Sequence, residues 1–560
     1  MNSREDLLSP EHGREPHVLS PDVRQARSRS WWVLWLSGVL ALAWFLIRVI
    51  PKPSRASYPC QRAAFPMASG FIVWLAGMCG ATAVLRKARF LLRQARWATA
   101  ATCLAAAIVG GVAGFLYLPA GPVLAQTPAP SAAATASAPA VPTLPPFSPS
   151  DPANTPMGIA LGVKPGRVAW AFEPRATTWD GTTNAPGWWD DGNTHPEVVE
   201  GMLSAAIRSV GDAASNKEAW NKLFTDLNVR KGKGKVGYKK GEKIVIKLNL
   251  NQVHDHGDGA KASYIAPQLV QALLRQLVRE AGIAPADITF YDAFRHVPST
   301  IFDRCTKEFP GVHFVDLVGG DGREKSVMDT TVALNLSQGG AQMFFPTCVT
   351  QAEYMINVAG LKGHTMAGMT VCAKNHLGSV FNPDGSPAAR NLHSTLAVKS
   401  FRGGPAQSMG SYNSLVDLNG HKEVGGKTVL YLIDALYATK HNEYRLDPSC
   451  RWESAPFNNN WTASLFASQD GVAIDSVALD FLRSEPSLAT IVTGPVDNYL
   501  HEAALANQPP SKTIYDPEKD GRPLASQGVH EHWNNAADKK YSRNLGTGAG
   551  IELVSVKPGS

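Results

Sequence analysis

The sequence predicts an α/β domain with a largely parallel or mixed sheet and flanking helices, preceded by about three transmembrane helices. Short β-branched runs alternate with helical patterns after residue 240, and three apolar runs lie before residue 120. We therefore divide the chain into a cytoplasmic tail (1–30), a membrane region (31–120), a Pro/Ala-rich linker (121–157) and an exported α/β domain (158–560).

The membrane region contains apolar runs at residues 31–50, 70–85 and 97–118. About 20 apolar residues can cross a bilayer as a helix, although buried core helices would give the same pattern. Basic residues precede the first run and fill the loop between the second and third. Because basic loops stay in the cytoplasm, we expect an inner (cytoplasmic) membrane protein. Its C-terminal domain would lie outside the cytoplasm, in the periplasm of a Gram-negative cell.

Residues 86–125 also have an alternative interpretation as a late signal sequence. They combine a basic start, an apolar middle and "VLAQ" as a small-residue cleavage context. Both interpretations export the remainder of the chain, and they differ in whether this segment is retained as a span or cleaved.

The formal net charge of +7 belongs to the membrane part. Residues 1–125 contain 14 Lys and Arg against 5 Asp and Glu, which leaves 40 against 42 for the remainder. The exported part therefore lacks the overall basic character typical of nucleic-acid binding, and we expect no nucleic-acid partner. The linker is rich in Pro, Ala and Ser, a composition typical of an extended tether.

Strands and helices alternate in the exported domain. "KIVIKLNL" (243–250) is typical of a buried strand, residues 266–282 have helical spacing, and "ITFYDA" (288–293) is the next strand. This order predicts a parallel crossover unit. Further strands are expected at 312–318, 352–360 and 428–436, a helix at 471–485 and a final short strand within 530–554.

Polar side chains follow the first predicted strand. Lys247 and Asn249 alternate onto one face at its end. In open α/β sheets, ligands bind beyond the carboxyl ends of the strands. We therefore predict both as catalytic residues, against the alternative of an ordinary lysine at a strand end.

A second group lies in "INVAGLKGHTMAGMTVCAKNHLG" (356–378). Lys362 and His364 leave a predicted buried strand with i, i+2 spacing, and Lys374 and Asn375 follow an apolar stripe. A buried lysine has a lowered pKa and can act as a base or an imine nucleophile, or it can hold a carboxylate or phosphate. We predict these four residues as catalytic, with His364 as an acid/base or a metal ligand.

Carboxylates form a third group. Asp434 ends the strand "LIDAL", and Asp470 and Asp475 lie at the start of the predicted helix 471–485. We expect them to bind a ligand or cation or to orient the lysines. For Asp470 alone, capping of the helix is an equally simple role.

The loop "NQVHDHGDG" (251–259) offers His254, Asp255, His256 and Asp258. Imidazole and carboxylate groups together suit zinc, iron, nickel or manganese. His254, His256 and His364 are the candidate metal ligands, with a solvated polar turn as the alternative.

The seven cysteines form no metal-binding pattern. Cys60, Cys79 and Cys103 lie in or near the apolar runs, and the other four are scattered without C-x-x-C spacing. A cysteine-ligated iron–sulfur cluster is therefore not supported, whereas one or two disulfides remain open.

The stretches "KIVIKLNL", "INVAGLKGHTMAGMTVCAKNHLG", "LIDAL" and "ASQDGVAIDSVALDFL" occur in the order typical of the domain of unknown function 362 family. The chain resembles this family over about residues 240–500. The resemblance implies an α/β domain with the predicted lysines, asparagines, His364 and aspartates at matching positions. Many members carry ferredoxin-like cysteine motifs and are labelled iron–sulfur proteins, but this chain has no such cysteines.

Three functions follow as hypotheses. The first is a membrane-anchored exported enzyme that acts on a small anionic metabolite with Lys, His and Asp chemistry and that could depend on a divalent metal. The second is a non-catalytic protein that binds a metal or anion. The third is an accessory factor of a redox or iron–sulfur system, which rests on the resemblance alone. The expected partners are the membrane and a small-molecule or metal ligand; protein partners stay open.

Overall fold

A computed structural model of the chain describes residues 151–257, 262–400, 406–441 and 445–558. The chain divides into two compact units, Met1–Thr143 and Leu144–Ser560, and every described residue belongs to the second. The predicted tail, the membrane region and the linker up to residue 150 lie outside the described residues. Within the four described ranges, no helix combines the length and the apolar character needed to cross a bilayer. The fold includes the end of the predicted linker, since Asn154 Nδ2 donates to the Trp533 carbonyl oxygen (2.9 Å).

The strands are β1 (Met157–Gly158), β2 (Arg167–Phe172), β3 (Ile244–Leu248), β4 (Ile288–Tyr291), β5 (His313–Asp316), β6 (Glu324–Lys325), β7 (Met328–Leu334), β8 (Met343–Pro346), β9 (Tyr354–His364), β10 (Gly368–Thr370), β11 (Thr428–Thr439), β12 (Ser464–Ser468), β13 (Val529–His530) and β14 (Glu552–Val556). The helices are α4 (Pro196–Gly211), α5 (Asn216–Arg230), α6 (Pro267–Arg275), α7 (Ser299–Glu308), α8 (Thr347–Thr350), α9 (Cys372–Asn375), α10 (Ala389–Leu392), α11 (Ser414–Gly420), α12 (Gly471–Ser484) and α13 (Asn498–Ala504). A π-helical turn, Gln276–Glu280, continues α6.

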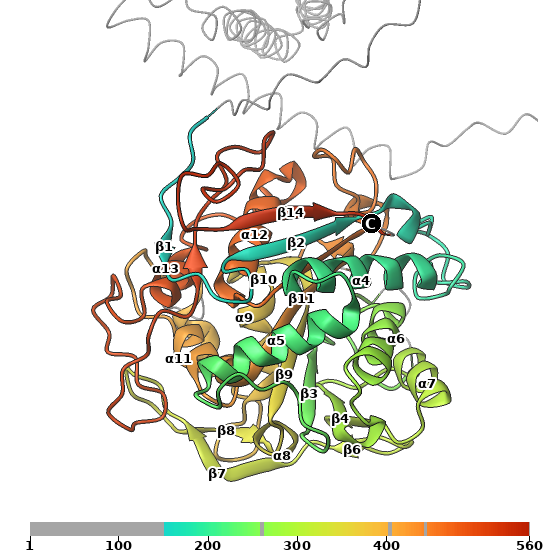
Figure 1. The fold of residues 1–560 in the computed structure, drawn as a ribbon, viewed down its shortest axis with the longest axis horizontal. Coiled ribbons are helices and arrows are strands. Elements are labelled where there is room, and N and C mark those ends of the chain that lie inside the picture. Colours follow the sequence, from blue (N-terminus) through green and yellow to red (C-terminus); the bar gives the residue numbers. More distant parts are fainter. Residues whose placement is uncertain (1–150, 258–261, 401–405, 442–444, 559–560) are drawn as a thin grey trace, which may run out of the picture. The chain divides into compact units, whose positions relative to one another are not determined.

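A ten-stranded mixed sheet runs through the domain in the order β14-β2-β12-β11-β9-β3-β4-β5-β6, with β10 paired to β9 (Figure 1). From β11 to β6 the neighbouring strands are all parallel. β12 is antiparallel to both β11 and β2, and β14 is parallel to β2. The parallel half brings the carboxyl ends of β9, β3, β4 and β5 to one edge, where open α/β folds bind ligands.

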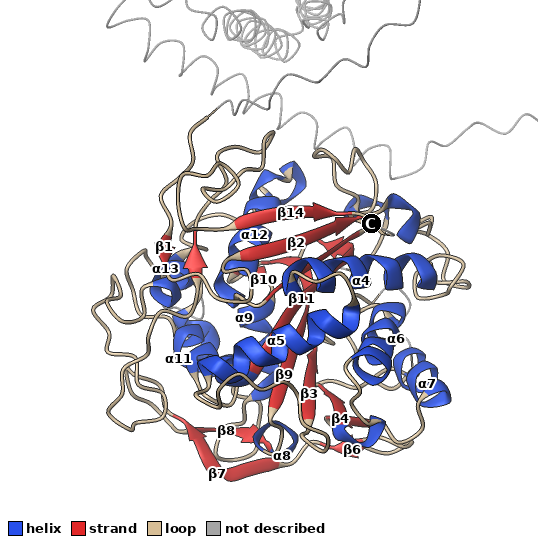
Figure 2. Cartoon of the chain, viewed as in Figure 1, coloured by secondary structure: helices blue, strands red, loops and turns tan. Residues whose placement is uncertain are grey.

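Helices cover both faces of the sheet (Figure 2). α4, α5 and α6 pack on one face and α9, α11, α12 and α13 on the other, and each face has its own buried apolar cluster. Alternation along β3 sends Ile244 and Ile246 to the α6 side and Val245 to the α12 side. By the same alternation Lys247 lies on the α12 side.

The predicted crossover is confirmed, because β3, α6 and β4 follow one another and β3 pairs with β4 in parallel. The other predicted strands are present as β5, β9, β11 and β14, and the predicted helix as α12. β9 is longer than expected, since it continues to His364. The sequence analysis did not predict β2, β12, α4 or α5. β2 and β12 lie in the sheet between β14 and β11, and α4 and α5 pack on one of its faces.

The four cysteines of the described ranges, Cys305, Cys348, Cys372 and Cys450, are free. The disulfides that the sequence left open therefore do not form among them. Burial raises the pKa of Cys305 and of Cys348 to about 12, which keeps both thiols protonated and unreactive.

Asp470 connects three segments of the fold. Its Oδ1 caps α12 by accepting from the backbone N–H groups of Val472 (3.1 Å) and Ala473 (2.9 Å). Its Oδ2 accepts from the N–H groups of Leu161 (2.9 Å) and Val529 (3.1 Å). The capping role considered from the sequence is therefore present, and it extends to the loop before β2 and to β13.

We predict that Asp470→Ala lowers the free energy of unfolding by about 2–4 kcal/mol, since it removes a cap and leaves buried N–H groups unpaired. Chemical denaturation of the full-length protein measures the change. Asp384→Ala is the control, because Asp384 is exposed and its hydrogen bonds with described residues go to Ser386 in its own turn. Equal losses in the two variants would contradict the structural role of Asp470.

Candidate ligand-binding site

Lys247 lies in β3 and is buried, with 1% of its surface exposed. Its Nζ donates to Asp292 Oδ2 (3.0 Å), to the Leu248 carbonyl oxygen (2.6 Å) and to Asn375 Oδ1 (3.3 Å). Asp292 directly follows β4, so this ion pair joins the carboxyl ends of two adjacent strands. An ammonium with three acceptors is satisfied, which makes Lys247 a structural group in this arrangement.

Asn375 extends the same network. Its Oδ1 also accepts from Asn249 Nδ2 (3.2 Å), and its Nδ2 donates to Asn357 Oδ1 (2.8 Å). Asn357 Nδ2 donates in turn to the Cys372 carbonyl oxygen (2.8 Å). Lys247 and Asn249 therefore converge on one side chain, and the network fixes α9 against the ends of β3 and β9.

Lys362 lies near the end of β9 in a different environment. It is 2% exposed, yet no side chain or carbonyl group of the described residues forms a hydrogen bond with its ammonium. The strand register pairs Lys362 with Thr370 and with Thr439, and paired residues present their side chains to the same face. Both threonine hydroxyls, and Asn249 Oδ1, are buried without a hydrogen-bond partner among the described residues. Each such atom costs about 1–3 kcal/mol, which a bound ligand would recover.

Lys374 is carried by α9 and is partly buried. Asp475 holds the start of this helix, because its Oδ1 accepts from Cys372 N–H (3.0 Å) and its Oδ2 from Ala373 N–H (2.9 Å). Within the described ranges, the ammonium of Lys374 has no hydrogen bond or ion pair. Asp475 therefore positions Lys374 without neutralising it.

Burial lowers the pKa of Lys362 to about 8 and that of Lys374 to about 7. The charge of Lys362 contributes to the lower pKa of Lys374, so the two ammonium groups lie within electrostatic reach of each other. Asp434 partly offsets the effect at Lys362. Its carboxylate accepts from Ala266 N–H (2.7 Å) and Leu436 N–H (2.9 Å), while burial raises its pKa to about 6.

His364 lies two residues after Lys362 in the same strand, so both side chains share one face as predicted. Its Nδ1 accepts from the N–H groups of Met366 and Ala367 (both 3.2 Å). Burial lowers the pKa of His364 well below its usual value, and the charge of Lys374 adds to this effect. The ring is therefore neutral, carries its proton on Nε2, and acts as a hydrogen-bond donor without a lone pair for a metal.

Two small cavities open beside these side chains. One of about 10 Å³ is lined by Asn249, Lys362 and Asp434, among others. The other, of about 30 Å³, is lined by residues that include Lys374 and Asp475. Such volumes admit water or the oxygen atoms of a small anionic group rather than a whole metabolite.

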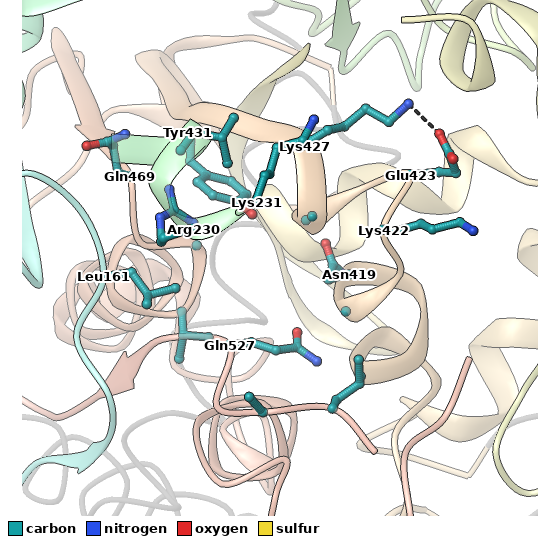
Figure 3. Close-up of a pocket in the computed structure, with 18 of the residues that line it drawn as sticks. Leu161, Arg230, Lys231, Asn419, Lys422, Glu423, Lys427, Tyr431, Gln469 and Gln527 are labelled. Carbon is teal, nitrogen blue, oxygen red and sulfur yellow. Dashed lines mark ion pairs between the residues drawn. The ribbon is translucent and has the colours of Figure 1, made fainter. Parts of the chain in front are cut away.

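A much larger cavity, of about 750 Å³, lies at the amino ends of β9 and β11 (Figure 3). Its charged lining residues are Arg230, Lys231, Glu353, Lys422, Glu423 and Lys427. Lys427 forms an ion pair with Glu423, and Lys231 with Glu353 (2.6 Å). Arg230 pairs with Asp226 on its own helix, so Lys422 alone of these charged lining residues has no ion pair with the described residues. Because most of these charges are already paired, we place the candidate site at the opposite edge, where Lys362 and Lys374 have no ion pair with the described residues, despite their smaller cavities.

The predicted metal ligands do not come together as one set. His256 lies with His296 and Asp316 in a group whose ligand atoms are all within 4.8 Å of one another. His254 is exposed, and neither His254 nor His364 belongs to this group. Asp258 lies outside the described residues.

Sequence reasoning missed several groups at this edge: Asp292, Asn357, Thr370, Thr439, His296 and Asp316. Asp292 and Asp316 carried a signal, since each is a carboxylate at the end of a predicted strand. The two threonines gave none, because only the strand register places them beside Lys362.

We predict that Asp292→Ala lowers the free energy of unfolding by about 3–5 kcal/mol, because it leaves the ammonium of Lys247 buried without its counter-ion. The double variant Lys247→Met/Asp292→Ala should lose less than the single variant, since no buried charge remains. Chemical denaturation compares the two. A larger loss of unfolding free energy in the double variant would contradict this explanation. The two side chains would then stabilise the fold through packing alone.

Two solved structures are similar to parts of the chain. One is a crystal structure of a protein from Thermotoga maritima, with 12% identity and a TM-score of 0.24 over 41% of this chain and 52% of that chain. The other is the lactate racemase apoprotein from Thermoanaerobacterium thermosaccharolyticum, with 10% identity and a TM-score of 0.18 over 52% of this chain and 60% of that chain. The chain thus spans only about half to three fifths of these proteins, and likeness this weak carries no argument about function.

Comparison with curated proteins gave no match. The family model described as "Domain of unknown function (DUF362)" matches residues 244–480, which include β3, β9, α9, β11 and most of α12. The segment that holds both the hydrogen-bond network and the unpaired lysines is therefore the matched one. This match supports the assignment of the chain to the DUF362 family over residues 244–480.

Proposed function

We propose that the domain is an enzyme that acts on a small anionic metabolite and holds its carboxylate or phosphate group between Lys362 and Lys374. One observation carries this proposal: the two lysines lie close enough to interact electrostatically, and neither ammonium has a hydrogen bond or an ion pair with the described residues. Only the longer-range attraction of Asp434 and Asp292 acts on Lys362. Buried cations without partners are costly, and an anion between them would remove that cost. The unpaired hydroxyls of Thr370 and Thr439 offer further donors to the same anion.

The roles of the lysines follow from their pKa values. Lys362, with a pKa of about 8, is mostly protonated at neutral pH and holds the anionic group. Lys374, with a pKa of about 7, is divided between ammonium and amine, and its amine takes a proton from the bound molecule. His364 donates through Nε2 to the negative charge that develops. The proposed reaction class is proton transfer next to an anionic group.

The setting of this enzyme is also part of the proposal. The three apolar runs and their basic loops support anchoring in the inner membrane, with the domain exported and the Pro/Ala-rich linker as a tether. A protein that only binds the anion would use the same lysines without proton transfer. Turnover therefore has to be tested apart from binding.

We predict that the full-length protein catalyses exchange of a C–H proton for deuterium in a small carboxylate, because Lys374 is poised as a base. Proton NMR in D₂O over a panel of 2-hydroxy and 2-oxo acids measures the exchange. Lys374→Met should abolish it, whereas Lys422→Met, in the large cavity, should leave it unchanged. Binding without exchange for every acid would favour the non-catalytic alternative.

The affinity for sulfate, whose charge is constant from pH 6.5 to 9, should fall as the pH rises through about 7 to 8. The pKa values of Lys374 and Lys362 lie at about 7 and about 8, so both lose their protons in this window instead of near 10.5. Only the protonated lysines attract the anion. Isothermal titration calorimetry measures the affinity, and Lys362→Met/Lys374→Met should be weak at every pH. A pH-independent affinity in the unsubstituted protein would contradict the assignment.

A further inference from the structure

A second group of side chains lies at the same edge of the sheet, beyond β3, β4 and β5. His256 follows β3, His296 follows β4, and Asp316 is the last residue of β5. Adjacent parallel strands end at this edge, so three residues far apart in sequence come together. Their ligand atoms all lie within 4.8 Å of one another.

The carboxylate of Asp316 is fixed before any ligand binds. It is fully buried, and its Oδ1 accepts from the N–H groups of Val318 (3.0 Å) and Gly319 (2.7 Å). Its Oδ2 accepts from Val297 N–H (3.1 Å) and lies 2.8 Å from His256 Nε2. Three backbone donors hold the carboxylate in place, with Oδ2 toward the imidazole.

The two imidazoles face this carboxylate with different partners. The His256 and His296 rings lie 5.2 Å apart between centroids. His256 Nδ1 is 3.3 Å from Asp321 Oδ2. With an ion bound at Nε2, the ring proton would lie on Nδ1, where Asp321 can accept it. This carboxylate–imidazole arrangement is the usual support of a metal-binding histidine. His296 Nδ1 is buried and has no hydrogen-bond partner within the described ranges.

We propose that His256, His296 and Asp316 bind a divalent first-row transition-metal ion. Two imidazoles and one carboxylate are too few and too nitrogen-rich for calcium or magnesium, but they suit zinc, iron, cobalt or nickel with open positions for further ligands. The 2.8 Å separation of His256 Nε2 from Asp316 Oδ2 is compatible with two atoms that each lie about 2.1 Å from one ion. The site goes beyond the lysine chemistry and does not depend on it, since it shares no residue with the lysine pocket.

The alternative is that His256 only forms an ion pair with Asp316. That alternative explains the 2.8 Å contact but not the buried, unpaired Nδ1 of His296. His296 is thus the residue that distinguishes the two. Its removal should cost little folding stability, because its Nδ1 makes no hydrogen bond to the described residues.

The test uses the full-length protein stripped with a chelator and titrated with Co²⁺, whose visible absorption reports coordination by nitrogen and oxygen. We expect one Co²⁺ per chain and a loss of affinity in His296→Ala beyond the about 10–100-fold typical when a residue that only hydrogen-bonds to a metal ligand is changed. Asp321→Asn should stay within that smaller range, because Asp321 contacts His256 and not the ion. His254→Ala is the matched control, since His254 lies in the same loop as His256 but outside the group.

Circular dichroism shows whether each variant remains folded, and sulfate binding shows whether the lysine site is intact. Loss of Co²⁺ in His296→Ala with sulfate binding retained would support the metal site by itself. No Co²⁺ binding in the unsubstituted protein, or equal binding in the folded His296→Ala variant, would overturn it. Loss of metal in His254→Ala alone would place the ion elsewhere in the loop and would also overturn it.

Discussion

The hydrogen-bond network between Lys247, Asp292 and Asn375 holds the carboxyl edge of the sheet together. It joins the ends of β3 and β4 and fixes α9, which carries Lys374, against them. Space around the ion pair is tight, because a Cβ at Gly378 would lie 3.0 Å from Lys247 Nζ. The positions of the candidate ligand-binding groups therefore depend on this buried ion pair.

The same edge thus contains satisfied and unsatisfied polar groups side by side. Lys247 donates to Asp292 and Asn375, and Asn375 donates to Asn357. These polar groups are therefore satisfied within the fold and stabilise it. Lys362, Thr370 and Thr439 are buried without that compensation within the described part of the chain, which lowers stability and raises the capacity to bind. Such a division is expected where part of an active site is held rigid by a supporting network.

The topology explains why two kinds of chemistry occur at one edge. The ends of β3, β4 and β5 bring imidazoles and a carboxylate together, whereas the end of β9 and the helix α9 bring amines. Asp292 follows β4 four residues before His296, and its carboxylate pairs with Lys247 of the adjacent strand β3. A metal ion and two ammonium groups would repel one another, and the lowered pKa values of Lys362 and Lys374 reduce that repulsion at neutral pH.

Periodicity along the sequence predicts the α/β class, the crossover β3–α6–β4 and the strands that carry Lys247 and Asp434, because buried strands and amphipathic helices have distinct periodicities. It placed Lys362 just beyond its strand, whereas β9 continues to His364. It also indicated that Lys362 and His364 share a face. The folded structure shows that Lys247 is paired, whereas Lys362 and Lys374 have no hydrogen bond or ion pair with the described residues. This does not follow from the sequence, because Asp292 comes from another strand. The folded structure likewise grouped His256 with His296 and Asp316, and gave Asp470 and Asp475 to backbone N–H groups. Contacts between distant segments depend on strand order and register, which local periodicity does not encode.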